Sequence, residues 1–278
     1  MKPNERPRSP RARVGAALLL CVIALCAVGP PLLGLDAETT APEQRLEAPS
    51  LAHPFGTDAV GRDLFARVLL GGRTSLLVGF AATLVSVGIG VLYGAVAGYR
   101  GGRLDDAMMR VVDFLYAIPY MFLVILVMLL FRDTARGRPL PVFLALGLVQ
   151  WLTLARIVRG EALRLRGAEF VQALRVLGAS DARILLRHVL PNAFGPIVVY
   201  GALTVPHVIL LESFLSFLGL GIDLSWGQLV AEGVAVVNPI ASPWWLLAAP
   251  AAFLATTLLA LQLLGDALRD ALDARLAR

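Results

Sequence analysis

The sequence predicts an all-α integral membrane protein with six transmembrane helices. Its residues are 58% hydrophobic and 16% charged, and the mean hydropathy of +0.74 lies outside the range of soluble proteins. The apolar residues also gather in six long runs without charge, each long enough for a helix that crosses a bilayer. These runs are residues 14–35, 74–99, 114–131, 139–155, 188–211 and 233–265.

The positive charges predict how the helices are oriented. Of the 25 Lys and Arg residues, 18 lie before residue 14, after residue 265, or in the connections 100–113 and 156–188. Basic residues accumulate on the cytoplasmic side of membrane proteins. We therefore expect both termini and these two connections in the cytoplasm. The basic residues are dispersed among the connections rather than gathered on one soluble face, which argues against nucleic acid as a partner.

The apolar runs also predict how the chain is organised. The largest cytoplasmic loop, 156–191, falls within the membrane-embedded core, and an acidic, proline-bearing linker follows the first helix. The expected order is a cytoplasmic arm (1–13), a first transmembrane helix (14–35), an external linker with an amphipathic helix (36–73), a core of five transmembrane helices (74–265) and a cytoplasmic tail (266–278).

Two helical patterns concern packing. Residues 61–70 alternate apolar and charged side chains at helical spacing, which favours a helix on the outer membrane surface or, equally, a helix that caps the bundle. Gly90, Gly94 and Gly98 continue a stripe of small residues along one face of the second span. Because helices in lipid associate through close backbone approach, this face should lie against another helix. Pro119 interrupts the third span and can kink it.

Several classes of protein lack the residues they need. Lys2 is the only lysine, and a P-loop requires a lysine after its glycine-rich turn, so we expect no Walker A site and no ATPase site on this chain. Neither a metal-ligand motif nor a nucleophile motif occurs, and we expect no catalytic residue, metal or cofactor on this chain. Cys21 and Cys26 are poorly placed on one helix for a disulfide.

Few ionisable residues fall within the spans, which argues against a proton- or ion-coupled secondary transporter. His207 and Glu212 are the exceptions, and a position near the outer interface explains both as well as a functional role does. A short glycine-rich stretch, 213–222, follows them and is too short to cross the membrane, so it suggests a re-entrant or interfacial segment. The candidates for the pathway or outer gate are His207, Glu212, Phe217 and Trp226.

The loop 156–191 contains a short helix that needs a partner. Residues 169–177 form one helical segment, Gly178 can stop it in a left-handed conformation, and Ser180 can cap a second segment. Phe170, Leu174 and Leu177 are spaced to give an apolar ridge. A helix this short is marginal in water, so it requires a groove on another protein or the membrane surface.

This loop resembles the EAA motif of ABC importer permeases, whose coupling helix docks into the ATPase subunit. Gln172 stands where the motif has Glu, and Leu174 stands where it has a second alanine. The matching stretches HPFGTDAVGRDLFARVLLGGRTSLLVG, GYRGGRLDDAMMRVVDFLYAIPYMF, WLTLARIVRGE and LLGDALRDALD occur in the order of the dipeptide, oligopeptide and nickel branch. The coupling residues implied are Glu169, Phe170, Gln172, Ala173, Leu174, Leu177, Gly178, Ile184, Leu190 and Pro191.

The resemblance is closest to the C subunit of oligopeptide permeases, and it implies a fold and a function. It implies a type I (MetI-like) permease bundle in the bacterial inner membrane that imports oligopeptides. The implied partners are a second homologous permease, two ABC ATPases that hold ATP and Mg, and an extracytoplasmic substrate-binding protein. Dipeptides, nickel chelates or another small solute are alternative substrates, and an ATP-independent channel or secondary transporter is the alternative of a different class.

Overall fold

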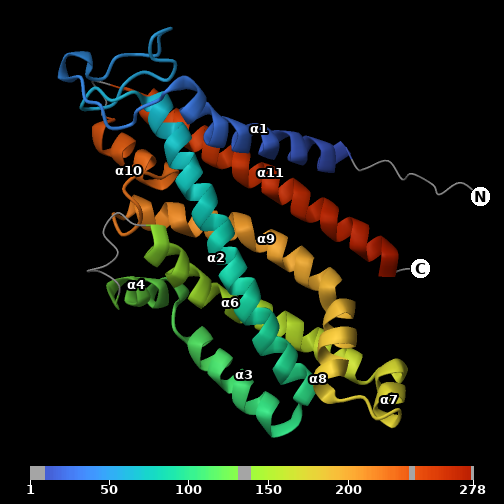
Figure 1. Ribbon diagram of the computed structural model, residues 1–278. Coiled ribbons are helices and arrows are strands. Elements are labelled where there is room, and N and C mark those ends of the chain that lie inside the picture. The colour runs from blue at the N-terminus through green and yellow to red at the C-terminus, as the bar shows by residue number, and fades with distance from the viewer. Residues whose placement is uncertain (1–9, 131–138, 238–241, 277–278) are drawn as a thin grey trace, which may run out of the picture. The chain divides into compact units, whose positions relative to one another are not determined.

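The computed structural model describes residues 10–130, 139–237 and 242–276, and every regular element in them is helical (Figure 1). The prediction of an all-α protein is confirmed. The chain divides into two compact units. Unit 1 comprises the described parts of residues 1–79, 133–142 and 205–278, and unit 2 comprises the described parts of residues 80–132 and 143–204.

The helices follow one another with short connections. A π-helical turn, Leu185–Val189, joins α8 to α9, and a 3₁₀ turn, Pro42–Gln44, follows α1. In chain order the helices are α1 (Pro10–Leu33), α2 (Leu64–Arg100), α3 (Gly102–Ala117), α4 (Tyr120–Leu130), α6 (Pro139–Arg166), α7 (Glu169–Val176), α8 (Asp181–Ile184), α9 (Leu190–Phe217), α10 (Trp226–Val236) and α11 (Trp245–Leu276).

Within the described residues, five helical segments are long and apolar enough to cross a membrane. They contain α1, α2, α6, the continuous stretch from α8 through α9, and α11. Helices α3 and α4 pass the same test only as a pair that bends by 92°, so the count is six if this pair is one span. The six predicted helices are therefore matched by five unbroken segments, and by six when the bent α3–α4 pair is counted as one broken span.

The break in the third span lies at Pro119. Ile118 adopts an extended conformation with ψ of 129°, and the axis turns before α4 begins. Proline lacks a backbone N–H and disfavours helical geometry in the residue before it, which accounts for the position of the break. The predicted connection 100–113 is mostly helix, because Gly101 and Gly102 turn the chain with positive φ angles and α3 starts at once.

Several helices extend past the apolar runs that predicted them. Helix α1 starts within the predicted arm 1–13, of which residues 1–9 lie outside the described residues. Helix α6 includes 156–166, and α11 continues to Leu276 through most of the predicted tail. Apolar runs mark the part of a helix that suits lipid. Polar residues can continue the same helix beyond it.

The separate amphipathic helix predicted over 61–70 is wrong, because these residues run into the first turns of α2. Leu64, Val68 and Leu69 are buried at 0–1% exposure, and Arg67 is buried on the charged side. The segment thus packs inside unit 1 on both faces. Of the two alternatives for this segment, the helix that caps the bundle is closer to the structure.

The core of unit 1 forms where α1 and α11 lie side by side (Figure 1). A Cβ atom added at Gly15 would lie 2.9 Å from the carbonyl oxygen of Ala260, so the two backbones approach closely. Trp226 is fully buried in the same core, and its indole N–H donates to the carbonyl oxygen of Val68 at 3.0 Å. Helix α10 is thereby fixed to the start of α2.

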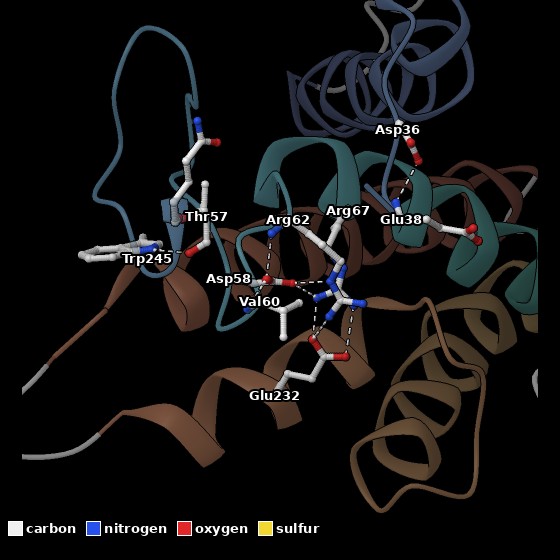
Figure 2. Close-up of polar contacts among 10 residues, drawn as sticks. Asp36, Glu38, Thr57, Asp58, Val60, Arg62, Arg67, Glu232 and Trp245 are labelled. Carbon is white, nitrogen blue, oxygen red and sulfur yellow. Dashed lines mark hydrogen bonds and ion pairs between the residues drawn. The ribbon is translucent and has the colours of Figure 1, made fainter. Parts of the chain in front are cut away.

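A buried ion network joins the 58–63 loop, α2 and α10 within unit 1 (Figure 2). Arg67 is 3% exposed, donates to Asp58 at 2.8 Å, and forms a two-bonded pair with Glu232. Burial acts to raise the pKa of Asp58, but hydrogen bonds from the amides of Arg62 and Val60 and the charge of Arg67 hold it below its usual range. The carboxylate is therefore the stable form at neutral pH.

Unit 2 is built on the contact between α2 and α6. Cβ atoms added at Gly90, Gly94 and Gly98 would lie 2.9, 2.3 and 2.4 Å from α6 carbonyl oxygens. No side chain larger than hydrogen fits there without moving a backbone. The glycine stripe of the second span does lie against another helix, and α6 is that helix. Arg159 of α6 then pairs through two bonds with Asp105 of α3.

We expect Gly94→Ala to lower both the membrane level and the thermal unfolding midpoint, because overpacking of this kind costs about 1–3 kcal/mol. Gly88→Ala is the matched control on the same helix, since a Cβ atom there would meet nothing within 4 Å. The measurement is the unfolding midpoint of the two detergent-solubilised variants. Equal midpoints would show that the close α2–α6 contact does not limit stability.

We also expect the Asp58 network to make stability depend on pH. Since folding lowers the pKa of Asp58, its contribution is complete above the unfolded pKa and disappears as pH falls through the folded pKa. At neutral pH, Asp58→Asn should cost about 3–5 kcal/mol, the range for breaking a buried ion pair. The loss should shrink on acidification. Unfolding midpoints from pH 7 downward test this, with Asp106→Asn, at an exposed position, as the control.

Candidate functional site

The candidate site is the tip formed by α7 and the turn into α8, at one end of unit 2 (Figure 1). One face of α7 is anchored in protein. Val171 is fully buried, and Leu174 packs against the cluster that contains Val158 and Ile184. This cluster includes residues of α2, α6 and α9, so the position of α7 is set by the helices that form unit 2.

The other face of α7 exposes apolar side chains. Phe170 is 40% exposed, Leu177 is 81% exposed and Val176 is 88% exposed. Glu169, Gln172 and Ala173 are exposed beside them. The tip thus presents apolar side chains that no other described part of unit 2 covers. Their contact with water is unfavourable, as in other exposed apolar patches that mark interaction sites.

The predicted ridge of Phe170, Leu174 and Leu177 needs one correction. Leu174 is half-buried against the core and contributes to anchoring rather than to the exposed face. Val176 takes its place, a residue that the sequence analysis missed. On a helical wheel Val176 lies on the side opposite Val171. The exposure of Val176 therefore follows from helical spacing once Val171 is known to be buried.

Gly178 ends α7 in a Schellman arrangement. Its φ angle is +77°, and its amide donates to the carbonyl oxygen of Arg175 at 3.0 Å. The amide of Ala179 donates to the carbonyl oxygen of Leu174, also at 3.0 Å. These are the two hydrogen bonds of the motif, and they satisfy carbonyls that a helix end otherwise leaves open. The left-handed glycine predicted at this position is present.

The second half of the turn differs from the prediction. Ser180 occupies the N-cap position of α8, but its side chain makes no capping hydrogen bond. Asp181 instead accepts a hydrogen bond from the hydroxyl of Tyr99 at 2.8 Å, and the guanidinium of Arg175 lies 5.5 Å from the centre of the Tyr99 ring. Tyr99, at the end of α2, therefore fixes the position of the turn through these contacts. No local sequence pattern indicates this role.

The remaining coupling residues serve the structure of the turn. Ile184 is fully buried in the cluster beneath α7, and Leu190 packs against that cluster. Pro191 is exposed at the second position of α9, directly after the π-helical turn Leu185–Val189. Gln172 donates to the carbonyl oxygen of Gly167 at 3.3 Å, which closes the entry to α7.

The candidates for a pathway or outer gate lie in unit 1, and two of them are fully enclosed. Glu212 and Trp226 are 0% exposed, whereas His207 and Phe217 are exposed. Glu212 accepts hydrogen bonds from Ser216 at 2.7 Å and from Ser75 at 3.0 Å. The hydroxyl oxygen of Ser75 in turn accepts from the amide of Trp226 at 3.3 Å.

This arrangement gives Glu212 and Trp226 a packing role. Hydroxyl groups satisfy the carboxylate and fix the start of α10 against α2 and α9, so neither side chain reaches an open surface of unit 1. The position of Glu212 thus reflects enclosure by protein, which sequence periodicity alone could not distinguish from a position at the membrane interface. No group of three or more potential metal ligands occurs in the part of the chain that the structure describes.

The sequence and the fold of this chain are similar to those of known transport proteins. Residues 90–278 match the family described as binding-protein-dependent transport system inner membrane component. A chain of the MetNI methionine ABC transporter, solved in inward-facing conformations, matches 75% of this chain and 97% of its own length with a TM-score of 0.61. At 19% identity that match shows the fold, and it confirms the predicted MetI-like bundle.

Curated relatives are similar over almost the whole chain. The oligopeptide transport system permease protein OppC of Haemophilus influenzae is 45% identical over 95% of this chain and 84% of its own length. OppC of Escherichia coli strain K12 is 46% identical over 95% of this chain and 87% of its own length. The dipeptide transport system permease protein DppC of Bacillus subtilis is 42% identical over 96% of this chain and 82% of its own length.

These matches agree with the motifs in the loop and the helices around it. The family match covers more than half of the chain, and relatives of 42–46% identity extend over nearly all of it. The chain belongs to the family of inner-membrane components of binding-protein-dependent transport systems.

Proposed function

We propose that this chain is a permease subunit of an ATP-driven importer of oligopeptides and that its α7 tip receives the force of ATP hydrolysis from a partner ATPase. The observation that carries the proposal is the exposed apolar face of α7, with Val176 and Leu177 more than 80% exposed on a helix whose opposite face is anchored. Such a surface is typical of a helix that docks in a groove.

The geometry of the tip suits the transmission of movement from a partner to the helices rather than catalysis of a reaction. A Schellman turn and the Tyr99–Asp181 hydrogen bond fix the tip to unit 2, so a displaced tip carries helices with it. Among the described residues, the tip contains no group of three or more potential metal ligands. Lys2 is the only lysine of the chain, so the nucleotide and Mg²⁺ belong on ATPase partners in this proposal.

The proposed assembly has five components. This chain pairs with a second, homologous permease subunit, and two ABC ATPases bind below the pair. A substrate-binding protein delivers the peptide from outside the cytoplasmic membrane. The distribution of Lys and Arg supports a cytoplasmic position for both termini and for the α7 tip.

Dipeptides are the second candidate substrate. The support is the 42% identity to the dipeptide permease DppC of Bacillus subtilis, which is close to the identity to the oligopeptide permeases. Both candidates use the same machinery in the membrane. They differ in the length of the peptide that the binding protein presents.

The test of the function is uptake by the reconstituted complex. Proteoliposomes that contain this chain, its companion permease and the ATPases should import radiolabelled tri- to pentapeptides when ATP and the binding protein are present. Import of dipeptides alone would select the second candidate. ATP-independent uptake by this chain alone would overturn the proposal in favour of a channel or secondary transporter.

We expect Leu177→Asp to weaken ATPase association about tenfold or more, because an interface that buries a leucine gains about 1.5–3 kcal/mol from it. Leu177 is exposed, so the change should leave the membrane level and unfolding midpoint unchanged. The measurement is ATPase pull-down and peptide uptake. Leu51→Asp is the matched control, since Leu51 is fully exposed in the linker after α1. Normal pull-down and uptake by Leu177→Asp would contradict docking at α7.

We expect Gly178→Val to uncouple ATP hydrolysis from uptake. A β-branched residue at a φ angle of +77° is strained by about 1–3 kcal/mol, so the Schellman turn should open and the tip should lose its fixed direction. ATP turnover per peptide imported should rise. Gly88→Val, at a helical position on α2 where an added Cβ meets nothing within 4 Å, is the control. An equal ratio of ATP hydrolysed to peptide imported in both variants would show that the turn has no part in coupling.

A further inference from the structure

Helix α6 carries an exposed polar face that begins within its apolar run 139–155 and continues into the connection expected in the cytoplasm. Between residues 141 and 160, its exposed positions are Leu148, Thr153, Arg156 and Gly160. Thr153, Arg156 and Gly160 are three and four residues apart, so they share one face. By contrast, the exposed residues of the neighbouring part of α2 include Leu84, Leu92 and Val96, which suit lipid.

Helix α3 extends this face. Arg156 donates to the carboxylate of Asp113 at 2.6 Å, and its guanidinium lies 4.0 Å from the centre of the Tyr116 ring. The Tyr116 hydroxyl and the Thr153 hydroxyl are 2.5 Å apart. We call Asp113, Tyr116, Thr153 and Arg156 the polar strip. The side chains of Asp113 and Arg156 remain 65% and 45% exposed despite their ion pair.

The polar strip lies beside an apolar part of α2. Gly94 and Gly98 meet α6 at Ala155 and Arg159, so Arg156 is level with the last turns of the apolar run 74–99. Asp113 and Arg156 lie at the cytoplasmic ends of their spans, whereas Tyr116 and Thr153 lie within the apolar runs 114–131 and 139–155. The strip therefore leads from the cytoplasmic side into the part of unit 2 that the apolar runs form.

The strip continues into a cavity at the broken span. A cavity of about 120 Å³ lies against the break between α3 and α4 and is lined in part by Tyr116, Pro119, Tyr120, Gln150 and Thr153. Broken helices at membrane depth are tolerated where they line a cavity, and they form substrate sites in many transporters. The rest of the cavity lining is mostly apolar, but the cavity and the strip share Tyr116 and Thr153, so the two are continuous within unit 2.

We propose that the polar strip lines the translocation pathway and contacts the peptide during transit. The proposal rests on the proposed function and adds the residues that meet the substrate. The Asp113–Arg156 pair has no net charge, so it repels neither acidic nor basic side chains. Arg156 uses one terminal nitrogen on Asp113, which leaves other N–H donors for peptide carbonyls, and the second carboxylate oxygen of Asp113 can accept from peptide N–H groups. The pair thus suits the backbone that all peptides share.

Thiol labelling of the assembled transporter tests this placement. In a Cys21→Ala, Cys26→Ala background, Thr153→Cys is compared with Leu92→Cys, and the probe is a charged, water-soluble methanethiosulfonate. Because the cysteine thiolate, which forms mainly in water, attacks the reagent and displaces its sulfinate group, Thr153→Cys should react on the order of tenfold faster or more. A translocated peptide, supplied with its binding protein and ATP, should slow this reaction and leave Leu92→Cys unchanged.

Two labelling results would overturn the proposal. Equal reaction rates at the two positions would show that the strip is not in water. A Thr153→Cys rate that rises only when the companion permease is removed, and that peptide does not alter, would show that the strip is an interface between permeases.

Transport by variants provides a second test with its own control. Arg156→Gln and Asp113→Asn should raise the KM for peptide uptake about tenfold, the size expected for one charge-assisted hydrogen bond, with ATPase pull-down unchanged. Arg103→Gln, at an exposed arginine at the start of α3, should transport normally. An unchanged KM for both strip variants would overturn substrate contact. If the unmodified complex imports no peptide at all, the proposed function fails, whereas faster labelling of Thr153→Cys that changes with ATP would still place the strip in a pathway.

Discussion

The close approach of α2 and α6 is the constraint on which unit 2 depends. Lipid offers helices no hydrophobic reason to associate, so contact must come from backbones that come near enough to pack. Gly90, Gly94 and Gly98 allow that approach, with α6 carbonyl oxygens so close that even a methyl group would displace them. The contact with α2 fixes the rotation of α6 about its axis and so determines what each of its other faces meets. One packs on the core beneath α7, one pairs with α3 through Arg159, and one is left open with Thr153 and Arg156.

In the α7 tip, some features are determined by the local sequence and others by packing against residues far away in the chain. Gly178 and the alternation of apolar residues are local, and they were sufficient to predict a short helix, its end and an exposed apolar side. The choice of which apolar residue is exposed depends on the core, because Val171 and Leu174 turn toward residues of α2, α6 and α9. Leu174 was therefore misplaced, and the anchoring residue Tyr99 was missed, since it lies 82 residues before its partner Asp181.

The same distinction explains the other differences between sequence and structure. Hydropathy predicted every span, because the thickness of the bilayer sets a minimum length for an apolar helix that crosses it. Packing in a soluble protein sets no such minimum length. It could not predict that α2 begins ten residues before its apolar run or that α3 starts directly after α2. Glu212 is the clearest case. Its charge predicted either function or an interfacial position, and only the structure shows that this side chain is enclosed by protein and accepts hydrogen bonds from serine hydroxyls.

Helix α6 links the two surfaces to which this molecule owes its proposed function. It runs without a break from the polar strip at Arg156 to Arg166, three residues before α7 begins, a distance of about 15 Å along the axis. Its inner face is held by the glycine contact and by the Arg159–Asp105 pair, so α6 and α3 are tied together between the strip and the tip. A force applied to the exposed face of α7 therefore reaches the strip through packed helices rather than through a flexible loop. Because Asp113 lies on α3 and Arg156 on α6, any shear between these helices would alter the pair that meets the peptide. Their second ion pair, one turn nearer to the tip, resists that shear and favours movement of the two helices as one body.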